Sequence, residues 1–203
     1  MMCQAKRAGY ERQHTALDLH DRKCDLNLAR LHKAGIKGVR TVSGDACELN
    51  EVLTSFDAMR GEQVKFDTVF IDAPCSGTGT MRRHPEIPWR LTEGDVTTEL
   101  PKLQLTMLKE AAARVAAGGE LIYATCSVFD EENTQVVDAF LSSPEGEGFS
   151  VAPLSEAQIL QLPEFEQAKK LVSVRQNDRG LFQSVPVNAD SYDGHFCARL
   201  VRK

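Results

Sequence analysis

Short apolar stretches alternate with amphipathic stretches along most of the chain. The apolar stretches have the length of strands, and the amphipathic stretches repeat apolar side chains every three or four residues, as helices do. Predicted strands cover residues 14–19, 39–43, 65–71, 120–125 and 195–200, and predicted helices cover residues 21–34, 48–56, 98–116 and 131–141. This alternation predicts an α/β fold, in which helices connect parallel strands and pack on the faces of the sheet.

The regular pattern stops at two places. Residues 72–91 are rich in glycine, proline and arginine, and this segment is too long for a simple connection. Gly118 and Gly119 are expected to end the long helix before the fourth strand begins. In sheets of this kind, ligands bind beyond the carboxyl ends of the strands. The residues at those ends are therefore the first candidates for a functional site.

Aspartates lie at or just past the ends of three predicted strands, and a cysteine follows the fourth: Asp18, Asp45, Asp72 and Cys126. An acidic residue at such a position in a nucleotide-binding sheet accepts hydrogen bonds from ribose hydroxyls. Any one of these aspartates alone is more often a helix cap or a loop residue. Three of them at successive strand ends favour a pocket for a ligand that carries hydroxyl groups, an amine and positive charge.

Composition restricts the class of protein. The chain has 203 residues, of which 42% are hydrophobic and 26% are charged, as is typical of a folded globular domain. No apolar run reaches the roughly 18 residues of a membrane span, and the first residues lack the apolar segment of a secretory signal. We therefore expect a cytoplasmic protein without a membrane partner. Because the net charge is −5, any binding of nucleic acid must use a local basic patch or parts outside this chain.

Six cysteines are spread along the chain without a CxxC pair. This spacing argues against a zinc site, and the absence of a secretory signal argues against a disulfide framework. We therefore expect no metal site, and we expect most of the cysteines to fill the core. Cys75 and Cys126 need a different explanation, because each lies just past a strand end and the two are expected to face the same crevice.

The segments around these two cysteines read DAPCSGTG at residues 72–79 and TCS at residues 125–127. They resemble the fourth and sixth motifs of the RNA (cytosine-5) methyltransferases of the Sun/Fmu type. The resemblance continues through residues 82–87, Gln104 and residues 193–196, so that it covers nearly the whole chain. An eight-residue match with a second motif at suitable spacing is far more specific than a lone glycine motif.

The resemblance implies a Rossmann-like methyltransferase sheet that is mostly parallel and has an antiparallel C-terminal strand. It also implies that residues 1–203 form a single, partial catalytic domain. The expected cofactor is S-adenosylmethionine, and the expected substrate is RNA, with ribosomal RNA favoured over transfer RNA. The target base would have to be unstacked, in single-stranded or flipped-out RNA.

The chemistry of this family explains why two cysteines are present. Carbon 5 of cytosine is a poor nucleophile until a thiolate adds to carbon 6, and a free thiol with a pKa of about 8.5 is mostly protonated at neutral pH. The resemblance implies that Cys126 is the nucleophile and that Cys75 assists release of the product. It implies that Asp72 holds the base edge and touches the cofactor, that Asp18 binds the ribose, and that Asp45 contacts the adenine side.

The chain has one compact basic and aromatic cluster, which consists of Arg82, Arg83, His84, Trp89 and Arg90. The cluster is suited to hold an RNA backbone and to stack a base. A solvated loop with a core tryptophan explains it about as well. We assign RNA binding to Arg82 and Arg83 alone.

A glycine-rich segment of the form APGGKT follows the first strand in the family, and this sequence has no such segment. We therefore expect an N-terminally truncated chain that lacks the first strand, its cofactor-binding loop and the family's RNA-binding region, which RNA and cofactor binding would need. Without its central strand, the sheet would have unpaired edges. A catalytically inactive fragment or an RNA-binding module therefore remains the alternative function.

Two other enzyme classes fit the cysteines less well. A phosphatase loop of the form Cys-x5-Arg is excluded because six residues separate Cys75 from Arg82. A DNA cytosine methyltransferase would use its Pro-Cys cysteine as nucleophile, and the TCS segment favours the RNA class instead.

Overall fold

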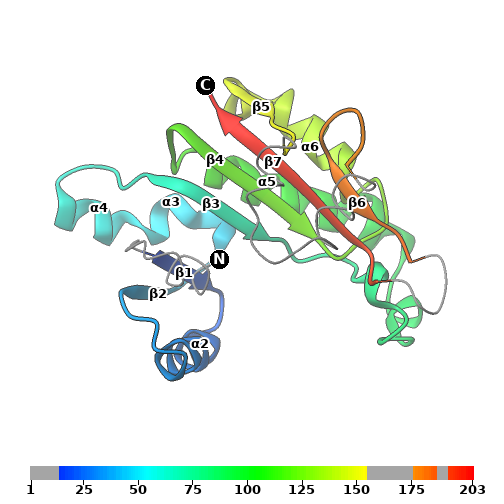
Figure 1. Ribbon diagram of the computed structural model, residues 1–203, viewed down its shortest axis with the longest axis horizontal. Helices are drawn as coiled ribbons and strands as arrows, with labels where there is room; N and C mark the ends of the chain where they lie inside the picture. Colours follow the sequence, from blue (N-terminus) through cyan, green and yellow to red (C-terminus); the bar gives the residue numbers. More distant parts are fainter. Residues whose placement is uncertain (1–13, 155–175, 187–191) are drawn as a thin grey trace.

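The computed structural model describes residues 14–154, 176–186 and 192–203. Its strands form two separate sheets (Figure 1). The smaller sheet pairs β1 (His14–Asp18) with β2 (Val39–Ser43) in parallel, and α2 (Asp21–Lys33) connects the two strands. These three elements agree with the sequence prediction to within one residue.

The larger sheet has five strands in the order β3-β4-β7-β5, and β6 also pairs with β7. Strand β3 (Phe66–Asp72) is parallel to β4 (Val115–Thr125). The strand at the C-terminus, β7 (His195–Arg202), is antiparallel to β4, as expected. Two short strands that the sequence did not predict, β5 (Phe149–Val151) and β6 (Phe182–Ser184), are also antiparallel to β7.

The boundary between the long helix and the fourth strand lies earlier in the chain than predicted. The structure has a π-helical turn at Asp95–Glu99 followed by α5 (Leu100–Ala112), and β4 already begins at Val115. The helix ends early because Arg114 turns inward, where its side chain is 1% exposed. Its guanidinium Nη1 donates to both carboxylate oxygens of Asp57 at 2.8 Å. Gly118 and Gly119 lie within β4, at a shift of its register against β3.

The helix predicted at residues 48–56 is broken into short pieces. A 3₁₀ turn at Ala46–Glu48 is followed by α3 (Leu49–Val52) and α4 (Thr54–Arg60). At the break, the carbonyl oxygen of Asn50 accepts hydrogen bonds from the Arg114 guanidinium at 2.8 Å and from the Thr54 hydroxyl at 3.1 Å. The Arg114 and Thr54 side chains therefore bind a helix carbonyl at the point where the helix is interrupted.

The main core lies between the larger sheet and two helices, α5 and α6 (Thr134–Leu141), which share one face of it (Figure 1). Alternate side chains of the strands point into this core, among them Leu121, Tyr123, Phe196 and Leu200, and the helices contribute Leu108 from α5 and Phe140 from α6. The opposite face is more open, and Phe70 on β3 is 54% exposed. Helix α6 begins three residues later than predicted, because residues 131–133 form a turn beneath the strand ends.

Candidate active site

The carboxyl ends of β3 and β4 bring two cysteines together. The two strands are parallel neighbours, and the Ala73 amide continues their pairing by donating to the Ala124 carbonyl at 2.9 Å. The chain then turns on both strands, and the Sγ atoms of Cys75 and Cys126 lie 3.1 Å apart. The Cys126 amide also donates to the Cys75 sulfur at 3.3 Å. The structure thus places the two predicted thiols in direct contact.

The contact between the sulfurs makes the two thiols unequal. The hydrogen bond from Cys75 lowers the pKa of Cys126 to about 7, against the opposing effects of burial and of the Asp72 carboxylate. The same hydrogen bond, together with burial, raises the pKa of Cys75. The Cys126 amide acts in the opposite direction on Cys75 but does not reverse this result. Cys126 is therefore the thiol that carries negative charge more readily.

A buried carboxylate lies beneath both cysteine loops. Glu132 is fully buried, and its Oε2 accepts hydrogen bonds from the Ser76 amide at 2.8 Å and from the Gln104 side chain at 2.9 Å. Its Oε1 accepts a hydrogen bond from the Ser127 hydroxyl at 2.7 Å. Because Ser76 follows Cys75 and Ser127 follows Cys126, this one side chain connects the two loops.

Two neighbours complete the support of the loops. Asn133 accepts a hydrogen bond from the Thr125 hydroxyl at 2.6 Å and donates to the Ser127 carbonyl at 3.0 Å, which holds the turn at Cys126. Gln104 donates to the Pro74 carbonyl at 2.9 Å, which holds the turn at Cys75. Gln104 was expected here only as part of the resemblance, and Glu132 and Asn133 were not predicted as site residues. The available signal was the Glu-Asn pair a few residues after TCS, in a position where charged side chains are usually exposed.

The glycines of the first motif allow a close backbone contact. The Gly79 amide donates to the Cys126 carbonyl at 2.8 Å, and the Gly194 amide donates to the Gly79 carbonyl at 2.8 Å. A Cβ atom on Gly79 would lie 2.1 Å from the Gly194 carbonyl oxygen. Glycine is therefore required at residue 79, and the segment at residues 193–196 belongs to the site because it closes over this loop.

The three aspartates do not lie on one sheet. Asp72 ends β3 and is exposed beside the cysteine pair, where its charge acts on Cys126. Asp18 ends β1 and Asp45 follows β2 of the smaller sheet, whose strands share no hydrogen-bonded ladder with β3. The Asp18 carboxylate accepts a hydrogen bond from the His20 amide at 3.0 Å and faces Lys23 at 3.9 Å, in both cases through Oδ1. Asp45 caps a 3₁₀ turn by accepting from the Cys47 amide at 2.8 Å.

The basic cluster is partly neutralised. Arg83 donates from Nε to Asp193 at 2.8 Å, and Arg82 lies 3.8 Å from the same carboxylate. Both arginine side chains remain about half exposed. Trp89 is 89% exposed, so the interpretation of this residue as a core tryptophan is wrong.

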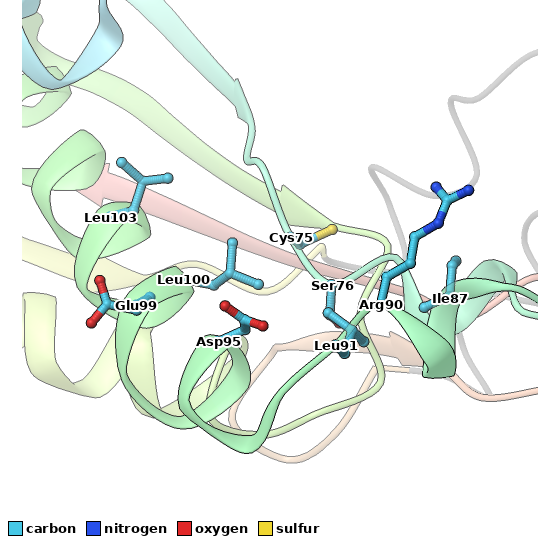
Figure 2. Close-up of a pocket in the computed structure, with 9 residues that line it drawn as sticks. All are labelled: Cys75, Ser76, Ile87, Arg90, Leu91, Asp95, Glu99, Leu100 and Leu103. Carbon is cyan, nitrogen blue, oxygen red and sulfur yellow. The ribbon is translucent and has the colours of Figure 1, made fainter.

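A pocket of about 600 Å³ opens next to Cys75 (Figure 2). Its walls come from the first cysteine loop, the following turn and the start of α5, and they consist of Cys75, Ser76, Ile87, Arg90, Leu91, Asp95, Glu99, Leu100 and Leu103. Neither Cys126 nor Asp72 is among these residues. The pocket therefore reaches the cysteine pair from the Cys75 side.

Within residues 14–154, 176–186 and 192–203, no helix is long and apolar enough to cross a membrane. In the same residues, histidine, cysteine and acidic side chains form no group of three or more that could hold a metal ion.

Proteins with known names resemble this chain in sequence. Two similar proteins are each named "Ribosomal RNA small subunit methyltransferase B": one from Citrobacter koseri is 36% identical over 144 residues, and one from Salmonella arizonae is 38% identical over 143 residues. Each alignment covers 70% of this chain and 28% of the relative, so the chain spans well under half the length of these proteins.

Solved structures share the fold. The crystal structure of PH0851 matches with a TM-score of 0.71 and 28% identity, over 94% of this chain and 37% of that one. NSun6 from Pyrococcus horikoshii, solved with SFG, matches with a TM-score of 0.68 over 98% of this chain and 44% of that one, and at 18% identity it supports the fold alone. These matches confirm the Rossmann-like methyltransferase fold. The family described as 16S rRNA methyltransferase RsmB/F matches residues 6–201, which confirms the resemblance to Sun/Fmu-type proteins, and the chain therefore belongs to this family.

Proposed function

We propose that this chain methylates carbon 5 of cytosine in ribosomal RNA, with S-adenosylmethionine as methyl donor. The family is one of rRNA methyltransferases, and the two relatives named above are ribosomal RNA small subunit methyltransferases. The observation that carries the proposal is the 3.1 Å contact between the sulfurs of Cys75 and Cys126 at the ends of two parallel strands. A pair of thiols in direct contact suits a reaction that needs one sulfur to bond to the base and a second to assist its release.

We assign the nucleophile to Cys126. Its thiolate adds to carbon 6 of the target cytosine, and the electrons of the C5–C6 double bond make carbon 5 nucleophilic. The lowered pKa of Cys126 supports this assignment, because the thiolate rather than the thiol adds to carbon 6. When bound, S-adenosylmethionine supplies an electrophilic methyl group for carbon 5.

We assign the release step to Cys75. After methylation, carbon 5 carries both a proton and a methyl group, and the Cys126 sulfur is still bonded to carbon 6. Loss of the proton from carbon 5 returns an electron pair to the ring, the C5–C6 double bond forms again, and the bond from Cys126 breaks. The Cys75 thiol touches the departing sulfur at 3.1 Å, so it can give its proton to that sulfur as the bond breaks and take up the proton from carbon 5 in exchange.

The aspartates fit a nucleoside cofactor and a cytosine in their donor and acceptor chemistry. Asp72 is exposed beside the cysteines, and we propose that it holds the N3–N4 edge of the base and touches the cofactor. The contacts of Asp18 both use Oδ1, which leaves Oδ2 to accept from ribose hydroxyls. Asp45 is proposed for the adenine side.

Two exposed arginines next to the cysteine loop are suited to bind RNA. We propose that Arg82 and Arg83 contact RNA phosphates through their exposed faces, and that the base enters from single-stranded or flipped-out RNA. We further propose that residues 1–203 act as a single catalytic domain in the cytoplasm, with a preference for ribosomal over transfer RNA. The relatives' additional length is proposed to contribute to RNA and cofactor binding.

The direct test is methyl transfer from labelled S-adenosylmethionine to small-subunit ribosomal RNA, followed by nucleoside analysis. We expect 5-methylcytosine with the unaltered chain and none with Cys126→Ala. A methylated product other than 5-methylcytosine would contradict the proposal.

A second candidate function is a non-catalytic RNA-binding module. The observation that favours it is the division of the strands into two sheets. Asp18 and Asp45 lie at strand ends of the smaller sheet, whereas Cys75 and Cys126 lie at strand ends of the larger one. Calorimetric titration of S-adenosylmethionine distinguishes the two candidates, with Asp18→Ala as the matched variant. Micromolar binding that Asp18→Ala abolishes supports the enzyme. A folded chain that binds RNA but no cofactor supports the module.

A further inference from the structure

The tryptophan of this chain lies on its surface, in the turn that follows the first cysteine motif. Trp89 is 89% exposed and is the single tryptophan among the 203 residues. An aromatic side chain of this size normally buries most of its area, so such exposure points to a binding surface. The neighbouring basic side chains are exposed as well, and they are Arg82, Arg83, His84 and Arg90.

The ring is carried by an ordered turn. A 3₁₀ turn spans Ile87–Trp89, and within it the Trp89 amide donates to the Glu86 carbonyl at 3.2 Å. The Ile87 side chain anchors the turn on the first cysteine loop, because a Cβ built on Gly77 would lie 3.2 Å from its Cδ1 atom. A rigid aromatic side chain loses little conformational freedom when a flat ligand stacks on it.

The turn is also close to the reactive cysteines. Gly77, on which Ile87 packs, is two residues after Cys75. Arg90, which follows Trp89, lines the same pocket as Cys75. Figure 2 shows Arg90 and Ile87 beside Cys75 and Ser76 at one end of this pocket, and the carboxylates of Asp95 and Glu99 toward the other end. An anionic ligand is therefore expected at the Arg90 end.

We propose that Trp89 and Arg90 form a stacking platform for a nucleobase of single-stranded RNA that neighbours the target cytosine. The Trp89 ring stacks on the base, and the Arg90 guanidinium contacts the adjoining phosphate. This inference rests on the proposed function, because a single-stranded substrate is what makes an unstacked neighbouring base available.

Charge favours RNA over an apolar protein segment as the occupant. Residues 82–90 carry three arginines (Arg82, Arg83 and Arg90) and one acidic residue, Glu86, and Asp193 contacts two of these arginines. The surface therefore keeps a positive balance in a chain whose net charge is −5. Nucleic acid binding commonly combines such a basic surface with aromatic side chains that accept any base.

Intrinsic fluorescence tests the platform directly, since all tryptophan emission comes from Trp89. We expect a single-stranded RNA oligonucleotide to quench this emission, and a blunt-ended RNA duplex of the same length to quench it much less. Binding is measured separately by the anisotropy of labelled RNA at fixed salt. We expect Trp89→Ala to weaken single-stranded binding by about 5- to 100-fold, the range of one lost base–aromatic stack, and Trp89→Phe to retain most of the affinity.

The matched control is Met59→Ala, which removes another strongly exposed apolar side chain, on α4. It should leave RNA binding unchanged. RNA that binds without quenching, RNA that does not bind, or equal affinity in Trp89→Ala would each overturn the platform. Covalent capture of RNA by Cys126 without quenching would remove this inference and leave the proposed function standing. Quenching without capture would contradict the proposed methylation and leave only the stacking of single-stranded RNA on Trp89.

Discussion

The sulfur atoms of Cys75 and Cys126 are 3.1 Å apart, although 51 positions separate the two residues in the chain. The contact follows from the pairing of β3 with β4, because parallel neighbours end at the same edge of the sheet. Beyond that edge, the Glu132 carboxylate accepts hydrogen bonds from both loops, and the Gly79 amide donates to the Cys126 carbonyl. The properties of each thiol therefore depend on the other and on this shared support.

The first prediction concerns the acidity of Cys126. Its thiol is expected to react with iodoacetamide with an apparent pKa of about 7. Because the Cys75 hydrogen bond is the largest cause of this lowering, Cys75→Ala should shift the half-maximal rate to higher pH. Mass spectrometry of the Cys126 peptide across a pH series measures the rate. Cys47, whose pKa burial raises to about 11, is an internal reference in the same samples. An unchanged Cys126 profile in Cys75→Ala would refute the proposed cause.

A second prediction tests the carboxylate that joins the loops. Glu132→Ala leaves the Ser76 amide, the Gln104 amide and the Ser127 hydroxyl without their acceptor. We expect the free energy of unfolding to fall by about 3 kcal/mol or more, since each buried unsatisfied group costs roughly 1–3 kcal/mol. Glu132→Gln keeps one acceptor oxygen and should lose less. Urea unfolding measures both variants, and equal losses would mean that the hydrogen bonds are not the cause.

The third prediction uses two glycines. Gly79→Ala would place a Cβ 2.1 Å from the Gly194 carbonyl oxygen, so one of the two backbones must move. We expect a loss of roughly 1–3 kcal/mol in stability and slower alkylation of Cys126, because the Gly79 amide contacts its carbonyl. Gly94→Ala is the control, because its Cβ would meet its nearest atom at 3.9 Å and its φ is −61°. A similar loss in both variants would argue against a specific contact at Gly79.

Acid sensitivity provides a fourth prediction. The Val64 amide and the Arg114 guanidinium hold the pKa of Asp57 below its usual range. A carboxyl whose pKa is lowered by folding stabilises the protein above its unfolded pKa, and that contribution disappears as pH falls through the folded pKa. Arg114→Met should therefore lower stability at pH 7 and flatten the decline in stability below about pH 4. Thermal unfolding at pH 7 and at pH 3 checks this, and an equally steep decline in the variant would contradict it.

Periodicity predicted most strands of this fold but not their grouping. The limits of β1 and β2 agree with the sequence pattern to within one residue, because apolar and polar residues alternate along each strand, and β7 begins where predicted but ends two residues later. The pattern missed the early start of β4, because the decisive residue is Arg114, and a buried arginine has no apolar signal. The pattern also predicted one parallel sheet, whereas the structure has two sheets, because alternation along the chain carries no information on which strands pair.

In the site, too, the local sequence pattern predicted some residues, and others depend on the tertiary structure. Motif spacing identified Cys75 and Cys126, because each follows a strand end. Glu132 was not identified, since a charged residue in a turn before α6 has the sequence pattern of an exposed one. The arginine pair was assigned without Asp193, a partner more than a hundred residues away that only the tertiary structure brings close.

Covalent capture of RNA containing 5-fluorocytosine, with S-adenosylmethionine present, tests the central claim most directly. The fluorine cannot leave carbon 5 as a proton does, so the bond from the nucleophile to carbon 6 persists and the complex is visible on a denaturing gel. The account predicts capture by the unaltered chain, none by Cys126→Ala, and accumulation of an adduct with ordinary RNA in Cys75→Ala. Capture that survives in Cys126→Ala and disappears in Cys75→Ala would contradict the assignment of the two thiols.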